Sequence, residues 1–353
     1  MNRSARRWGA LAACAAVSLA ACAPRAPAPV PVAASTSAEP VIREIEPWSF
    51  RGADGVIIST AHYRLFTTAA GAPVMTRLPA FLEDALEQYR SLGGDPATGE
   101  RLPAPAIRLD TFMVSSRTEW EDLTVRLMGD RAGDYLRIER GGFAAGGRGV
   151  FYTAGAGDDR TTLAIAAHEG WHQYAQRTMR DPLPVWLDEA LAVYSEGYRE
   201  NLSRPGGAEF LPWANPERFD QLRSAWARGD LLELEKLLEA SPQRLLAVST
   251  EGTLDYYAQL WALAHFVRED APMRAGLHML LADAAGGRVR DNLRRQYGAR
   301  GAERILALRQ GPLLFQMYIA ADMTVAASRY RAFVERIVQA GAKERIVLGL
   351  PPV

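Results

Sequence analysis

Two histidines and a glutamate stand at a spacing that suits metal chemistry. In "TTLAIAAHEGWHQYAQ", residues 161–176, His168 and His172 are four positions apart and Glu169 directly follows the first. On a helix, positions i and i+4 lie one turn apart on the same face, so both rings can address one point. Glu169 lies roughly a quarter turn away, where it can reach a metal-bound water but is poorly aimed to be a ligand. The spacing therefore indicates metal-assisted hydrolysis with Glu169 as general base.

Catalytic zinc (Zn²⁺) usually takes three protein ligands and a water, so a third ligand is needed. The segment "DPLPVWLDEALAVYSEG", residues 181–197, has Pro184 at a plausible first turn and then continues as an apolar helix. Glu189 lies on this helix, and packing of the two helices would bring it to the zinc. Glu196, two turns further along, is expected to support a ligand histidine and, as a second choice, to be the ligand itself. Asp188 is expected to be a surface or capping acid.

A structural role for the two histidines is the competing interpretation, because core histidines satisfied by carbonyl groups would show the same spacing. The chain contains five histidines, and two of them lie on either side of a glutamate on one predicted helix. A second predicted helix, which carries acidic residues, follows. This combination favours zinc. The other three, His62, His265 and His278, are predicted to be ordinary core or surface residues. Gly170 and Trp171 have no predicted role beyond packing.

Together these residues resemble the gluzincin group of zinc metallopeptidases. The resemblance is carried by "HEGWH" and by "WLDEALAVYSE", residues 186–196, and is most similar to the peptidase-MA-like domains of exported bacterial proteins. Those domains also begin with a strand of the "IISTAHYRLF" type, residues 57–66, and the likeness would cover residues 55 to about 269. It implies that His168, His172 and Glu189 bind zinc and that Glu169 passes its proton to the leaving amine.

The resemblance also implies how a substrate would be held. An edge strand before the metal-binding helix would pair with the substrate backbone, and "GGFAAGGRGVFYT", residues 141–153, is its counterpart. The glycines of this segment fit a mobile loop or a plain hairpin turn equally well. In "LDYYAQLWALAHFV", residues 254–267, Tyr257 would stabilise the oxyanion, with Tyr256 as the alternative. "GGFAAGG" lacks the acidic residue that the aminopeptidase branch uses to bind a free amino terminus, which argues against exopeptidase activity.

The predicted strands and helices that must position these residues indicate an α+β fold. Residues 46–158 are expected to form a small mixed subdomain, with strands in "GVIISTAHYRLFTTA", "AIRLDTFMVSS" and "RGVFYTAG". Its helices would be "VMTRLPAFLEDALEQYRSL" and "RTEWEDLTVRLMG", the second capped by Ser115 or Ser116. Residues 159–345 are expected to form a helical metal-binding subdomain. Its predicted helices are 161–178, 185–199, 230–239, 243–248, 255–268, 273–284 and 324–340.

The N-terminus predicts export. Residues 1–21 combine a basic start with a short apolar run, which is typical of a signal peptide. "LAAC", residues 19–22, resembles the lipobox of bacterial lipoproteins, so Cys22 would carry lipid, although an ordinary cleaved signal could mimic it. Residues 22–45, rich in proline and alanine, would then be a linker. The expected location is the cell envelope, most simply the outer membrane facing the periplasm.

Composition limits the partners. Lys and Arg total 41 and Asp and Glu total 41, so no net charge draws the chain to nucleic acid or to an anionic membrane. We therefore expect a membrane-anchored zinc endopeptidase with a peptide or protein substrate and no nucleic-acid partner. The alternative is a non-catalytic envelope lipoprotein that uses a zincin-like fold to bind a peptide or protein. Glu169 argues against it, because a binding module needs no general base. A hydrolase acting on a non-peptide amide stays open.

Overall fold

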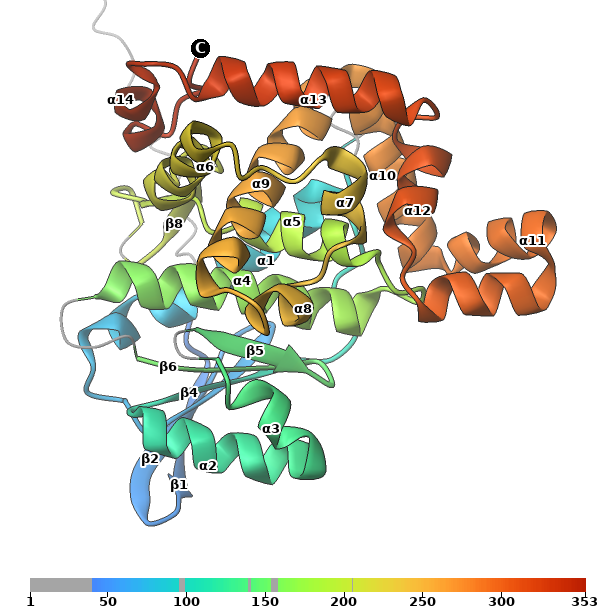
Figure 1. Cartoon of the computed structure of the whole chain (residues 1–353). Coiled ribbons are helices and arrows are strands. Elements are labelled where there is room, and N and C mark those ends of the chain that lie inside the picture. Colours follow the sequence, from blue (N-terminus) through green and yellow to red (C-terminus); the bar gives the residue numbers. More distant parts are fainter. Residues whose placement is uncertain (1–39, 95–98, 139–140, 154–157, 205) are drawn as a thin grey trace, which may run out of the picture. The chain divides into compact units, whose positions relative to one another are not determined.

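A mixed six-stranded sheet forms the first part of the fold (Figure 1). Its strands follow the order β1-β2-β3-β4-β6-β5; the first three are antiparallel, β4 is parallel to both β3 and β6, and β5 is antiparallel to β6. In β3, Tyr63, Leu65 and Thr67 are buried on one face while Arg64 is exposed, as the two-residue period of a strand requires. The strands are β1 Glu44–Phe50, β2 Ala53–Ser59, β3 Tyr63–Thr67, β4 Leu109–Val114, β5 Gly142–Ala145 and β6 Arg148–Tyr152.

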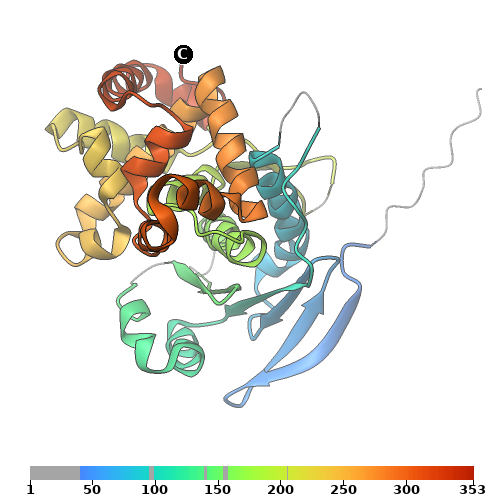
Figure 2. The same ribbon diagram turned by 90° about the vertical axis from the view of Figure 1, so that its right-hand side faces the viewer.

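Helices cover both faces of this sheet (Figure 2). Helices α1 (Leu78–Leu92) and α4 (Asp159–Thr178) pack on one face, and α2 (Arg117–Met128) packs on the other, with η1 (Pro73–Thr76), η2 (Gly129–Arg131) and α3 (Ala132–Tyr135) in the connections. The Ser116 hydroxyl accepts a hydrogen bond from the Glu119 amide at 3.2 Å, so Ser116, not Ser115, caps α2. Each predicted strand and helix of residues 46–158 is present.

The second part of the chain is almost entirely helical. It contains α5 Val185–Tyr194, α6 Pro216–Arg228, α7 Leu234–Glu239, α8 Pro242–Leu246, α9 Thr250–Glu269, α10 Ala271–Gly286, α11 Arg288–Ala307, α12 Gly311–Tyr318, α13 Met323–Ile337 and α14 Ala342–Val347. A small hairpin of β7 (Tyr198–Glu200) and β8 (Ala208–Phe210) interrupts them. The predicted helix 185–199 was too long: α5 ends at Tyr194, where the chain turns toward β7.

The computed structural model describes residues 40–94, 99–138, 141–153, 158–204 and 206–353. The predicted signal peptide 1–21, the lipidated Cys22 and most of the linker 22–45 lie outside these residues. Residues 40–353 form one compact unit, and its main buried core contains side chains from both sides of the predicted boundary at residue 158. The α+β prediction is confirmed. Within the described part of the chain, no helix combines the length and apolar character needed to cross a bilayer.

Candidate metal centre

Helix α4 carries both histidines and Glu169 through the middle of the molecule. Asp158 caps its start by accepting a hydrogen bond from the Thr161 amide at 3.2 Å. The Tyr89 hydroxyl donates to the Ala167 carbonyl at 2.7 Å, and a Cβ on Gly170 would lie only 2.5 Å from that hydroxyl. Gly170 therefore has a structural reason that the sequence did not reveal: it leaves space for Tyr89 of α1 to reach the α4 backbone.

Helix α5 brings the third predicted ligand to the same point. It packs on α4 through an apolar face, and one nitrogen of each histidine and one oxygen of Glu189 all lie within 4.8 Å of one another. Glu189 Oε2 is 3.6 Å from His168 Nε2 and 3.4 Å from His172 Nε2. Ligand atoms bound tetrahedrally to one zinc ion through bonds of about 2.1 Å would be about 3.4 Å apart. The two distances from Glu189 thus match this separation, and the three side chains could hold a metal ion.

The state of these ligand atoms also fits a cation. Glu189 Oε2 is buried and makes no hydrogen bond with a described residue, so the two Nε2 atoms at 3.4 and 3.6 Å are the partners that the structure gives it. Both histidines have their Nδ1 atoms bound to other carboxylates, which leaves the Nε2 lone pairs directed to the shared point. Two imidazoles and a carboxylate form a donor set that zinc accepts.

Glu196 holds His168, as predicted for a supporting carboxylate. Its Oε1 is 2.9 Å from His168 Nδ1. Arg218 of α6 binds both oxygens of the same carboxylate, with Nε at 3.0 Å from Oε2 and Nη2 at 2.9 Å from Oε1, and Asn215 donates to Oε2 at 3.0 Å. Burial opposes ionisation of Glu196, but Arg218 and His168 outweigh it and lower its pKa to about 2. The sequence pattern did not single out Arg218 or Asn215.

Asp188 supports the His172 ring through Nδ1, as Glu196 supports that of His168. Its predicted role as a surface or capping acid was wrong. Its Oδ1 accepts from His172 Nδ1 at 3.0 Å and from Trp171 Nε1 at 3.1 Å, while Arg309 donates to Oδ2 at 2.6 Å. Burial favours the neutral acid, but His172 and Arg309 lower the pKa of Asp188. The error came from placing Asp188 by helix angle alone, because the indole of Trp171 and the guanidinium that follows α11 reach that side of α5. Trp171 therefore has a role beyond packing.

The metal-free centre attracts protons to its histidines. Burial alone would lower the pKa of each ring. Interactions with Glu189 and Glu196 outweigh burial at His168 and raise its pKa to about 9, and Asp188 and Glu189 raise the pKa of His172. A cation that binds here therefore replaces bound protons.

Glu169 is a buried glutamate on the same helix as the two histidines. It is 8% exposed, and no hydrogen bond or ion pair links its carboxylate to another described residue. Burial raises its pKa more than the adjacent histidines lower it. A carboxylate with a raised pKa accepts and returns a proton more readily near neutral pH. A Cβ added at Gly142 of β5 would lie 3.2 Å from Glu169 Cγ, so this end of the edge strand runs directly beside the carboxylate.

The two candidate tyrosines of α9 are in different positions. The ring of Tyr257 lies edge-on to the His168 ring, with 5.8 Å between centroids, and its hydroxyl makes no hydrogen bond within the described residues. Tyr256 is fully buried and its hydroxyl donates to the Ala240 carbonyl at 3.3 Å. Of the two, Tyr257 is the one whose ring contacts a candidate ligand, His168, and whose hydroxyl is not already bonded to a backbone carbonyl. The guanidinium of Arg218 lies 5.2 Å from the Tyr257 ring centroid, so one arginine contacts both the supporting carboxylate and this ring.

The glycine-rich segment forms a hairpin. Gly146 and Gly147 turn the chain between β5 and β6 with φ values of 59° and 70°, a region that favours glycine. Gln176 of α4 fixes this turn by accepting from the Gly147 amide at 2.9 Å and donating to the Ala144 carbonyl at 3.0 Å. Of the two interpretations that the sequence left open for this segment, the structure shows the hairpin turn. As the resemblance implied, β5 is an edge strand, with its turn end attached to α4 and its Gly142 end beside Glu169.

The other histidines take no part in this centre. His62 Nδ1 lies 2.7 Å from Glu83 Oε2, and His265 is buried and stacked on Trp213 with 3.5 Å between centroids. Burial lowers the pKa of His265, which is the behaviour of a core histidine. The predictions for these two residues as ordinary core or surface histidines are confirmed.

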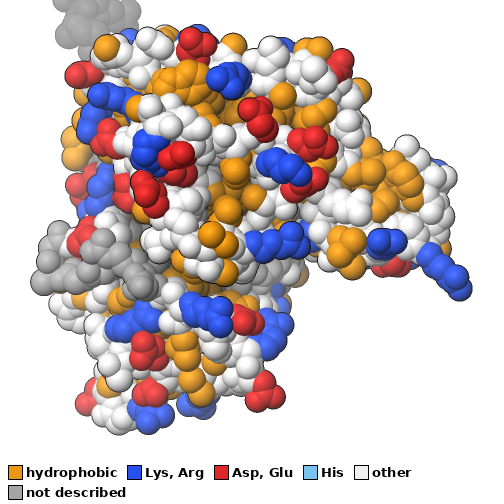
Figure 3. Space-filling model, in the orientation of Figure 1, with side chains coloured by type: hydrophobic (Ala, Val, Ile, Leu, Met, Phe, Trp, Pro, Cys, Tyr) orange, Lys and Arg blue, Asp and Glu red, His pale blue; other side chains and the backbone are white. Residues whose placement is uncertain are grey.

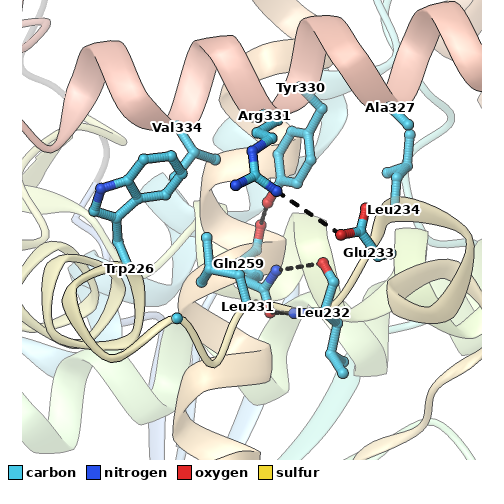
Figure 4. A pocket seen from close by; sticks show the side chains of 11 residues that line it. Trp226, Leu231, Leu232, Glu233, Leu234, Gln259, Ala327, Tyr330, Arg331 and Val334 are labelled. Atoms are coloured by element: carbon cyan, nitrogen blue, oxygen red, sulfur yellow. Dashed lines mark hydrogen bonds and ion pairs between the residues drawn. The ribbon is translucent and has the colours of Figure 1, made fainter.

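A hollow of about 160 Å³ elsewhere on the helical part contains none of the candidate site residues (Figure 4). Residues 229–234 and helices α6, α9 and α13 surround it. Its amide Gln259 exchanges two hydrogen bonds of 3.0 Å with the Leu232 backbone, and Arg331 pairs with Glu233 at 3.9 Å. Because these polar groups already have partners, the hollow offers little chemistry for recognising a ligand.

Comparisons of the chain with protein-family models, with curated proteins and with solved structures gave no match. A functional assignment for this chain therefore rests on the geometry of the candidate metal centre.

Proposed function

We propose that this chain is a zinc-dependent peptidase, acting as an endopeptidase in the cell envelope. The single observation that carries the proposal is the convergence of His168, His172 and Glu189 on one point, with the unbonded carboxylate of Glu169 on the same helix. A structural histidine cluster would not need a buried glutamate without a hydrogen bond or ion pair to any described residue, which is what Glu169 is.

Each residue then has one task. His168, His172 and Glu189 hold the ion, while Glu196 and Asp188 fix the orientation of the two rings. Zinc, when bound, supplies a water of lowered pKa and polarises a carbonyl oxygen. Glu169 accepts a proton on its carboxylate and returns it to the departing amine, which its raised pKa favours. The Tyr257 hydroxyl donates a hydrogen bond to the carbonyl oxygen of the substrate, which becomes negatively charged during the attack.

The edge strand supports a peptide substrate. A strand at the edge of a sheet can pair with an added chain, and although Gln176 already binds the Ala144 carbonyl, the Gly142 end of β5 lies next to Glu169. A peptide added along β5 would carry its backbone past the ligand cluster. We retain export, a lipid on Cys22 and outer-membrane attachment as part of the proposal, on the basis of the N-terminal sequence.

The decisive experiment compares the unaltered chain with Glu169→Gln. Zinc content is measured by mass spectrometry, and hydrolysis of a mixed peptide library is followed with and without a chelator. We expect both proteins to bind zinc and the variant to lose at least about a hundredfold in turnover. Equal turnover in both zinc-loaded proteins would refute the peptidase assignment. Zinc binding without hydrolysis by either protein would favour the non-catalytic binding protein or a hydrolase acting on another amide.

A further inference from the structure

Helix α11 is a basic hairpin that projects from the helical part of the fold (Figure 1). The chain reverses at Gly298, where φ is 71° and ψ is 171°, so the element consists of two short helices joined at a turn. Its buried residues lie at the base of the two halves, whereas residues 294–301 between them include no buried residue. The far end of the hairpin is thus presented to the solvent.

The charge of this hairpin differs from that of the chain. Residues 288–307 contain six arginines against Asp291 and Glu303, a surplus of four positive charges in a protein whose net charge is zero. Figure 3 shows basic side chains on the projection. The equal totals of acidic and basic residues therefore conceal a local positive surface, because a whole-chain count averages over distant elements.

Three of the arginines have no acidic partner among the described residues, although Arg295 donates to the amide oxygen of Asn292. At the base, Arg288 pairs with Asp283 at 2.7 Å and Arg290 pairs with Asp181 and Glu303. By contrast, Arg295, Arg300 and Arg304 are exposed and form no ion pair with any residue that the structure describes. Arg300 and Arg304 are one helical turn apart and therefore share a face.

An apolar and aromatic component accompanies these charges. Tyr297, directly before the turn, is 41% exposed, and Leu308, just after the hairpin, is 59% exposed. Tyrosine favours the boundary between water and lipid, because its ring is apolar and its hydroxyl is polar. Guanidinium groups bind phosphate oxygens through paired hydrogen bonds. Exposed arginines beside an exposed tyrosine are thus suited to a layer of phospholipid headgroups.

We propose that the α11 hairpin binds the surface of an anionic phospholipid bilayer. Each arginine near such a surface strengthens binding about fivefold, so three arginines on a small tip can bind it through charge alone. A stable protein interface needs about 800 Å² on each partner, which an eight-residue projecting turn does not readily provide. The contact would orient the folded unit on a membrane without using any residue of the metal centre, so it stands independently of the proposed function.

The test uses a chain beginning at Pro40, because residues 40–353 form one compact unit that contains every described element. Co-sedimentation is measured with vesicles of phosphatidylcholine alone and with vesicles that also contain phosphatidylglycerol, in the presence of a chelator. We expect binding to the anionic vesicles only. The triple variant Arg295→Gln, Arg300→Gln, Arg304→Gln should lose about a hundredfold in the apparent partition coefficient.

The matched control removes the same charge elsewhere. Arg108, Arg126 and Arg223 are exposed and likewise form no ion pair with a described residue, so their triple change to Gln should alter partitioning by less than about threefold. Equal losses in both variants, or equal binding of the unaltered chain to neutral vesicles, would overturn the proposal. The unaltered chain gives a second test: binding should disappear at about 1 M salt, where charges are screened beyond about 3 Å, and persistence there would also overturn it.

Discussion

Asp188→Asn is the substitution that tests the metal centre with the least damage to the fold. The carboxylate accepts hydrogen bonds from His172 at 3.0 Å, Trp171 at 3.1 Å and Arg309 at 2.6 Å. An asparagine keeps the shape and one acceptor oxygen but removes the negative charge. That charge fixes the orientation of His172 and makes its Nε2 a stronger ligand for a metal ion. We therefore expect weaker zinc binding in a folded protein.

The expected magnitudes follow from these contacts. Loss of a carboxylate that supports a ligand histidine weakens metal binding by about 10- to 100-fold, which is about 1.4–2.8 kcal/mol. The stability cost should be about 1–2 kcal/mol, because the Arg309 side chain is 33% exposed and water can replace its lost partner. Glu196→Gln should cost more stability, about 3 kcal/mol, because it leaves the Arg218 side chain, 14% exposed, without its anion.

The assay is competition for zinc against a chromophoric chelator at fixed pH. Glu83→Gln is the matched control, since Glu83 also binds a histidine Nδ1, that of His62, but outside the metal centre. It should leave zinc affinity unchanged. Zinc affinity of Asp188→Asn within twofold of the unaltered chain, or an equal loss in Glu83→Gln, would refute the reasoning.

Three further outcomes are expected. In the metal-free protein the pKa of His168, about 9, and the raised pKa of His172 both lie above the unfolded value of about 6.5. The stability that these two protonated rings contribute is therefore complete below about pH 6.5 and is lost toward pH 9. Thermal melting in the presence of a chelator should give a lower Tm at about pH 9 than at about pH 6.5, and the opposite order would contradict the charge assignment. Tyr257→Phe should lower kcat about 10²- to 10³-fold with little change in KM. Tyr256→Phe should leave kcat unchanged, because the hydroxyl of Tyr256 is bonded to the Ala240 carbonyl. The reverse pattern would exclude Tyr257 as the donor to the oxyanion. Gly170→Ala should lower the free energy of unfolding by about 1–3 kcal/mol, because the new Cβ would lie 2.5 Å from the Tyr89 hydroxyl. Gly252→Ala should not lower it, because its Cβ would have its nearest neighbour at 3.6 Å. Chemical denaturation measures both, and an unchanged free energy of unfolding in Gly170→Ala would disprove the packing role.

The ligand cluster was largely predictable from the sequence, because its information is local. The spacing of His168 and His172 fixes their common face on one helix, and Pro184 and the apolar run after it predict the helix that carries Glu189. Helices α1, α4 and α9 follow the apolar spacing that defines them. The helix-rich second part and the mixed sheet follow from the same patterns.

Glu196 was predicted as a supporting carboxylate, but the arginines that bind the two supporting carboxylates were not predictable, because they come from distant segments. Arg218 is 22 residues from Glu196, and Arg309 is 121 residues from Asp188, so no local period connects them. Arg309 also adopts a φ of 47°, an uncommon conformation for a non-glycine residue, which no pattern indicates. The end of α5 at Tyr194 was missed because the residues that follow it, through Arg199, continue a plausible helix while tertiary pairing with β8 forms a strand.

We propose above all that His168, His172 and Glu189 bind one zinc ion. Zinc stoichiometry after dialysis against a buffered free-zinc concentration, for the unaltered chain and for His172→Ala, Glu189→Gln and Glu169→Gln, tests it most directly. We predict one zinc per chain in the unaltered protein and in Glu169→Gln, and strongly reduced occupancy in the other two. Absence of zinc from the unaltered chain, or full occupancy in Glu189→Gln and His172→Ala, would contradict the account.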